Sequence, residues 1–119
     1  MVRKQRGKSK MDTLLEKDEL IKAVQGNEIG SGKAECFFSD VQTDSRNVSQ
    51  DSKVMFVPLL GEFQDGHKYI PSVLEKNPGV ILLNDSEYNK RIDFYDELAK
   101  KYDEVCFIKV ENTLHALQA

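Results

Sequence analysis

Two short polar segments of the chain carry the side chains best suited to chemistry. In the first, a hydroxyl, a carboxylate, a second hydroxyl and a guanidinium follow one another at Thr43, Asp44, Ser45 and Arg46. Asp and Ser commonly order a turn by bonding their own backbone, and Arg presents a fork of donors that suits phosphate or carboxylate. This set can hold a polar ring and an anion. The same residues also fit a plain capped turn in which Arg46 forms a salt bridge.

The second segment runs from Gly61 to His67 and reads G-E-F-Q-D-G-H. Its two glycines allow close approach of the backbone to a ligand. The helix expected after it would direct an N-terminus, a natural anion site, at the segment. An ordinary connection between a strand and a helix would have the same composition, so both interpretations stay open.

Other sequence patterns that could bind phosphate, bind metal or catalyse a reaction lack residues that they require. The segment G-S-G-K at Gly30–Lys33 lacks the first glycine of a phosphate loop, because Asn27 stands there. Ala34 also replaces the Ser or Thr that would bind magnesium. His67 and His115 are the only histidines, so neither a nucleophile triad nor a metal cluster can be argued. The sequence therefore predicts binding residues, with no catalytic residue and no metal ligand.

Apolar periodicity and turn signals predict strands that alternate with helices, which is typical of an α/β domain. We expect a small single domain with a mixed, partly parallel sheet flanked by helices. The expected helices are Leu14–Gln25, Lys68–Lys76, Glu87–Tyr102 and the start of one at Thr113–Gln118; the strands are Ala34–Val41, Val54–Leu60, Val80–Leu83 and Val105–Val110, with a turn at Asn27–Lys33 and a loop at Thr43–Ser52. Ligands of such sheets bind beyond the carboxyl ends of the strands, where both polar segments fall.

The composition fits one compact domain. The 119 residues are 39% hydrophobic and 31% charged, with a mean hydropathy of −0.51. No apolar run approaches the roughly 20 residues that cross a bilayer, and no secretory signal is present, so we expect a cytoplasmic protein without membrane association. Cys36 and Cys106 form no C-x-x-C pair and lie in apolar stretches. We expect both to be buried, reduced thiols.

Charge is unevenly distributed along the chain. Residues 1–10 carry five basic side chains and no acidic one, whereas the other 109 carry 12 basic and 20 acidic, a net charge of about −8. We expect residues 1–11 to be a disordered extension or a cloning remnant, and residues 12–119 to be the folded domain. The acidic domain argues against nucleic acid as a partner, because phosphate contacts dominate that affinity.

Three stretches in register resemble the N-terminal domain of the Mur ligases of the MurE and MurF types. They are T-D-S-R at Thr43–Arg46, V-M-F-V-P-L-L-G-E at Val54–Glu62 and F-Q-D-G-H-K-Y-I at Phe63–Ile70. The ending V-E-N-T-L-H-A-L-Q at Val110–Gln118 is similar to the MurF segment that leads into the ATP-binding domain, which favours MurF over MurE. Pro58 replaces the usual Ala, and Asn112 replaces the usual Asp.

The resemblance implies that this chain is one of three domains that together perform the reaction of one enzyme. The full MurF-type enzyme joins D-alanyl-D-alanine to a UDP-N-acetylmuramoyl-tripeptide with ATP and Mg²⁺, and this chain corresponds to its first domain, which holds the UDP part. The implied partners are the UDP-N-acetylmuramoyl-peptide and the missing central and C-terminal domains, with no cofactor in this region. The chain alone is expected to bind and not to catalyse.

The resemblance also assigns site residues. Thr43, Asp44, Ser45 and Arg46 match the motif that lines the uridine pocket, and Gly61, Asp65, Gly66 and His67 match the motif that faces the diphosphate. Arg46, His67 and Lys68 would supply the local positive charge. The alternative is a non-enzymatic, ligand-sensing or regulatory module of the same fold, as in the N-terminal domain of HPr kinase. The two motifs favour the ligase, because a sensor does not need both of them in this register.

Overall fold

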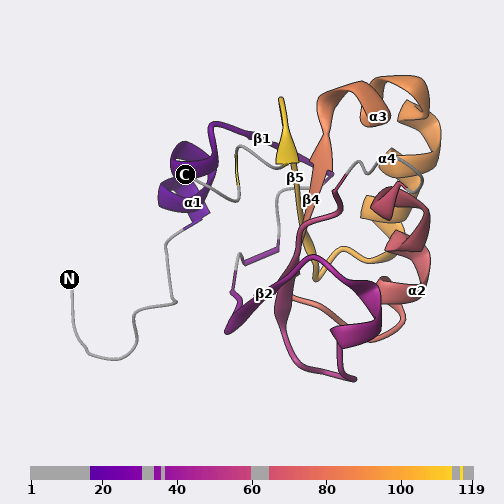
Figure 1. Ribbon diagram of the computed structural model, residues 1–119. Coiled ribbons are helices and arrows are strands. Elements are labelled where there is room, and N and C mark those ends of the chain that lie inside the picture. Colours follow the sequence, from indigo (N-terminus) through magenta and orange to yellow (C-terminus); the bar gives the residue numbers. More distant parts are fainter. Residues whose placement is uncertain (1–16, 31–33, 36, 60–64, 114–115, 117–119) are drawn as a thin grey trace.

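The computed structural model describes residues 17–30, 34–35, 37–59, 65–113 and 116. Within them a five-stranded sheet has helices on both faces, with α1 on one side and α2, α3 and α4 on the other (Figure 1). The strands are β1 (Asn27–Ile29), β2 (Asp40–Gln42), β3 (Val54–Phe56), β4 (Val80–Asn84) and β5 (Cys106–Val110); the helices are α1 (Lys17–Val24), α2 (Ile70–Leu74), α3 (Asp85–Lys90) and α4 (Ile92–Lys101), with the 3-10 turns η1 (Ser45–Asn47) and η2 (Gly66–Tyr69).

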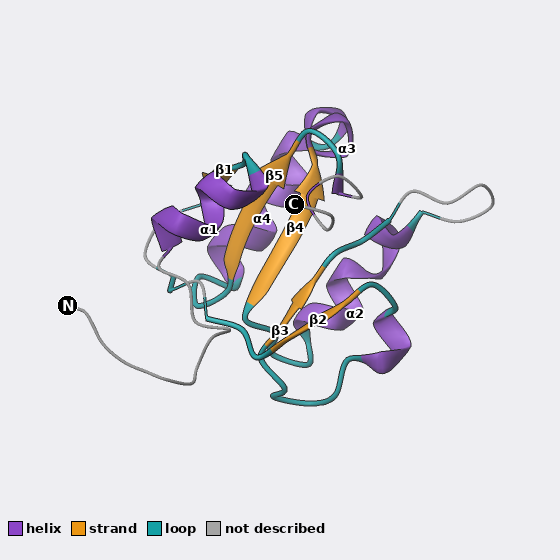
Figure 2. Cartoon of the chain, turned by 60° about the vertical axis from the view of Figure 1, so that its left-hand side comes forward, coloured by secondary structure: helices purple, strands orange, loops and turns teal. Residues whose placement is uncertain are grey.

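The strand order across the sheet is β1-β5-β4-β3-β2 (Figure 2). The four strands β2, β3, β4 and β5 are parallel to one another, and β1 pairs with β5 in the antiparallel sense. This confirms the expected α/β domain with a mixed, partly parallel sheet. Because the parallel strands all end at the same edge, the segments that follow them are brought together there.

The sheet separates two apolar clusters. The central strand β4 is buried along its whole length, so its side chains alternate between the clusters. Val80 and Leu82 pack in the cluster that α1 covers with Leu20 and Val24. The opposite cluster takes the β4 side chains Ile81 and Leu83 and side chains from α2 and α4, among them Ile70, Val73, Leu74, Tyr95 and Ala99. Because apolar side chains cover both faces of the sheet, a shift of one residue would move them to the wrong face. The register of the strands is therefore fixed, and with it the position of the carboxyl edge.

Several expected elements differ from the observed ones. The expected strand Val54–Leu60 is observed as Val54–Phe56, and the helix expected from Lys68 begins only at Ile70, after η2. Strand β1 lies where a turn was expected, and β2 begins at Asp40, later than the expected strand from Ala34. The single helix expected from Glu87 to Tyr102 is two helices, because Arg91 leaves the helical conformation with φ −140° and ψ 49°. Helical periodicity does not reveal a break of one residue. The expected elements at residues 14–16 and the extension at residues 1–11 lie outside the described residues.

Cys106 is fully buried in β5, as expected, but the expectation of a reduced thiol was wrong for this residue. It is disulfide-bonded. The expectation rested on the absence of a C-x-x-C spacing and on apolar surroundings, and neither feature excludes a disulfide. Cys36 lies outside the described residues.

Candidate functional site

The first polar segment forms a turn directly after β2. The Asp44 carboxylate accepts the Arg46 backbone N–H at 2.9 Å and so caps η1. It also accepts the Arg46 side chain, from Nη2 at 2.8 Å and from Nε at 3.1 Å. These bonds to Arg46 lower the pKa of Asp44 from 3.8 to about 2, and they raise the pKa of the guanidinium. The turn is held by its own ion pair, while 86% of the Arg46 side chain stays exposed.

The backbone amides at the start of η2 are already used within the protein. The Gly66 N–H donates to the Leu59 carbonyl at 2.9 Å, and the His67 N–H donates to the Asp65 carboxylate at 2.9 Å. The Lys68 N–H donates to the Asp65 carbonyl at 3.2 Å. At the N-terminus where an anion was expected, these three amides therefore donate to Leu59 and Asp65.

His67 is a buried structural residue, with 2% of its surface exposed. Its Nε2 atom accepts the backbone N–H of Asn84 at 3.0 Å, so the ring hydrogen lies on Nδ1 and donates to Asp65 Oδ1 at 2.7 Å. His67 was expected to face a diphosphate and to supply charge; the structure instead places its ring in the protein interior, with both ring nitrogens engaged in internal hydrogen bonds.

The two polar segments meet at one pocket, which we call pocket 1. It has a volume of about 440 Å³, within the range of ligand sites in proteins. Its lining residues are Thr43, Asp44, Ser45, Arg46, Leu59, Gly66 and Tyr69. The structure thus brings all four residues of the first motif together with Gly66 of the second. Asp65 and His67 flank Gly66 without lining pocket 1, and Gly61 lies outside the described residues.

Sequence reasoning missed two residues of pocket 1, Leu59 and Tyr69. Leu59 closes the apolar stretch after β3, and Tyr69 comes at the end of η2. Both could have been found by asking which apolar side chains end a strand or begin a helix at the carboxyl edge. They add an aliphatic and an aromatic surface to two hydroxyls and one ion pair. This arrangement can hold a flat polar ring and, through Arg46, an attached anion.

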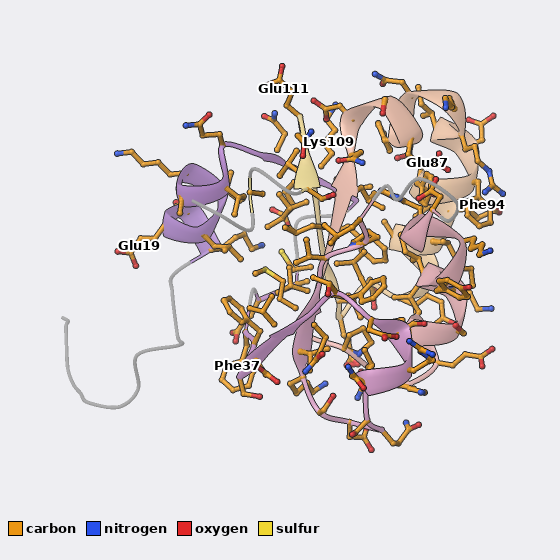
Figure 3. All side chains as sticks on the ribbon, in the orientation of Figure 1. Glu19, Phe37, Glu87, Phe94, Lys109 and Glu111 are labelled. Carbon is orange, nitrogen blue, oxygen red and sulfur yellow. The ribbon has the colours of Figure 1, made fainter. Side chains whose placement is uncertain are left out.

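A second hollow lies at the opposite edge of the sheet. Its lining residues are Ala34, Glu35, Phe37, Lys53, Gly79, Asp103 and Glu104, and its volume is about 470 Å³. Phe37 there is far from Glu111, which follows the carboxyl end of β5 (Figure 3). Three carboxylates against one lysine make this hollow a poor site for a nucleotide or another anion.

Among the described residues, no group of three or more His, Cys, Asp or Glu side chains could hold a metal ion. None of the helices that these residues form combines the length and the apolar character that a membrane crossing needs.

The described residues thus form a small α/β domain with a ligand-sized pocket at the carboxyl edge of its sheet. Two known enzymes resemble most of this chain. The UDP-N-acetylmuramoyl-L-alanyl-D-glutamate--2,6-diaminopimelate ligase of Clostridium tetani is 32% identical over 99 residues, which are 83% of this chain and 18% of the ligase. The UDP-N-acetylmuramoyl-tripeptide--D-alanyl-D-alanine ligase of Treponema pallidum is 34% identical over 105 residues, which are 88% of this chain and 22% of the ligase.

These similarities relate the chain to the Mur ligases, the enzymes of peptidoglycan precursor synthesis. The chain spans about a fifth of the length of these relatives. The two identities are almost equal, so the comparison does not choose between the MurE and MurF types. No protein-family model matches the chain.

Proposed function

We propose that this chain is the UDP-N-acetylmuramoyl-peptide-binding domain of a Mur ligase of the MurF type. The observation that carries the proposal is pocket 1, where the T-D-S-R turn and Gly66 line one hollow of about 440 Å³. The names of both relatives describe UDP-N-acetylmuramoyl substrates. The ending at Val110–Gln118 supports the MurF type over the MurE type.

Each part of pocket 1 has a role in this proposal. The uracil ring lies against the apolar surfaces of Leu59 and Tyr69, which are suited to stacking and packing. The hydroxyls of Thr43 and Ser45 supply donors and acceptors for the ring and the ribose. The diphosphate extends toward Arg46, whose guanidinium is fixed at one side by Asp44 and open to solvent at the other.

ATP and Mg²⁺ belong elsewhere in the proposed whole enzyme. The described residues include no carboxylate cluster for a metal, and the G-S-G-K segment does not fit a phosphate loop. We propose that this chain binds its ligand without catalysing a reaction. The other ligase domains are its proposed partners, and sharing a ligand with them would raise the effective concentration, so the chain alone should bind weakly.

Calorimetric titration of the chain with uridine, UDP and UDP-N-acetylmuramoyl-tripeptide tests this proposal. Arg46→Ala should weaken UDP binding about tenfold, the scale of one charge-assisted hydrogen bond, and should leave uridine binding unchanged. Lys90→Ala is the matched control, because Lys90 is an exposed cation at the end of α3, away from pocket 1. Absence of binding by all three ligands at millimolar concentration, or equal UDP affinity in wild type and Arg46→Ala, would contradict the proposal.

A further inference from the structure

Thr113 lies just after β5 and is 1% exposed, so it does not line pocket 1. It nevertheless makes two short hydrogen bonds, one to the neighbour of a residue that lines pocket 1 and one to the last residue of β4. Its hydroxyl donates to the Pro58 carbonyl at 2.6 Å, and its backbone N–H donates to Asn84 Oδ1 at 2.7 Å. Thr113, which follows β5, therefore joins the segment after β3 to the carboxyl end of β4.

The first hydrogen bond leads directly to the wall of pocket 1. Pro58 precedes Leu59, which lines the pocket and accepts the Gly66 N–H at 2.9 Å. The contact between these backbones is tight, because a Cβ at Gly66 would lie 3.0 Å from the Leu59 nitrogen and 3.1 Å from the Pro58 Cα. A shift of Pro58 must therefore move Gly66, since no free space separates them.

The second hydrogen bond connects Thr113, through Asn84, to the two residues that flank Gly66. Asn84 holds Thr113 with its side chain and His67 with its backbone N–H. His67 in turn donates to Asp65 through Nδ1 at 2.7 Å. Asp65 and His67 are the two neighbours of Gly66 in the chain, so this route fixes the backbone on both sides of it.

We propose that Thr113 is a positioning residue for ligand binding at pocket 1. It sets the distance between the backbone segments at Leu59 and Gly66, and it couples the pocket to the part of the chain that follows β5. This inference rests on the proposed function of pocket 1. Coupling between two sites is reciprocal, so a ligand in pocket 1 must also stabilise the hydrogen bonds of Thr113.

Two substitutions distinguish the effect of the Thr113 hydroxyl from the effect of the shape of its side chain. Thr113→Val keeps the volume and the backbone N–H but leaves the Pro58 carbonyl without its donor, whereas Thr113→Ser keeps the donor. In the absence of ligand, Thr113→Val should shift the Leu59 and Gly66 amide signals in NMR spectra, and Thr113→Ser should not. With UDP as the probe, Thr113→Val should weaken binding about fivefold, the low end of measured coupling between sites, and Thr113→Ser less than twofold.

Hydrogen exchange in the wild-type protein gives a test that does not depend on how well a variant folds. Saturating UDP should slow the exchange of the Thr113 amide, whose donor bond to Asn84 lies outside pocket 1. Unchanged exchange at Thr113 in the UDP complex, or unchanged Leu59 and Gly66 signals in a folded Thr113→Val, would overturn the inference. If wild type binds no UDP, the proposed function fails, and the ligand-free amide shifts alone decide whether Thr113 positions the pocket wall.

Discussion

Removal of the Asn84 side chain should lower stability by an amount that the structure defines. Asn84 is 3% exposed, and its Oδ1 atom accepts the Thr113 N–H at 2.7 Å. In Asn84→Ala this N–H stays buried without an acceptor, which costs about 1–3 kcal/mol. The hydrogen bond from the residue 84 backbone to His67 is retained, so the loss is confined to one acceptor and its packing.

Urea unfolding followed by circular dichroism measures this cost. The midpoint should fall while the slope with denaturant stays the same, because the surface exposed on unfolding hardly changes. Gln50→Ala is the matched control, since Gln50 also makes one side-chain amide hydrogen bond, to the Glu75 carbonyl at 3.4 Å, but at an exposed position. It should change stability by less than about 0.5 kcal/mol. Equal losses in both variants would refute the argument from buried hydrogen bonding.

Three further predictions concern packing, pH and a buried hydroxyl. Gly79→Ala should destabilise the protein by about 3 kcal/mol in urea unfolding, the upper end for overpacking, because its Cβ would lie 1.9 Å from the Phe37 carbonyl oxygen; a loss below 1 kcal/mol would contradict this. The Asp44 carboxyl should titrate by NMR at a pKa of about 2, so its stabilisation is complete above pH 3.8 and disappears as the pH falls through 2; a midpoint near 3.8 would be inconsistent with the ion pair. Tyr95→Phe should cost about 1.5–3 kcal/mol in the same unfolding assay, because the hydroxyl donates to the Glu87 carboxylate at 2.9 Å, and an unchanged midpoint would disprove that contribution.

The apolar strands were the most predictable part of the fold. Runs such as Val80–Leu83 and Val105–Val110 leave few alternatives to a buried strand, and both form interior strands of the sheet. Strand β1 was not predictable, because N-E-I has no strand pattern and is held by backbone pairing with the distant β5. The segment before Asp40 was misleading, since Phe38 packs in the core from irregular backbone.

The site was predictable where its contacts are local. Asp44 and Arg46 are two residues apart, so their types alone indicated the capped turn and its ion pair. The role of His67 was not predictable, because its partner Asn84 lies 17 positions away and Thr113 a further 29 positions on. Hydrogen bonds between distant segments decide whether a histidine faces a ligand or the protein interior, and the sequence carries no local signal for them.

Amide chemical-shift mapping with UDP is the most direct test that pocket 1 is the ligand site. The account predicts that UDP shifts the amide signals of Thr43–Arg46, Leu59, Gly66 and Tyr69, which line pocket 1. The signals of Lys53 and Gly79, which line the hollow at the opposite edge of the sheet, should stay in place. Shifts confined to that opposite edge, or no shifts at millimolar UDP, would contradict the account.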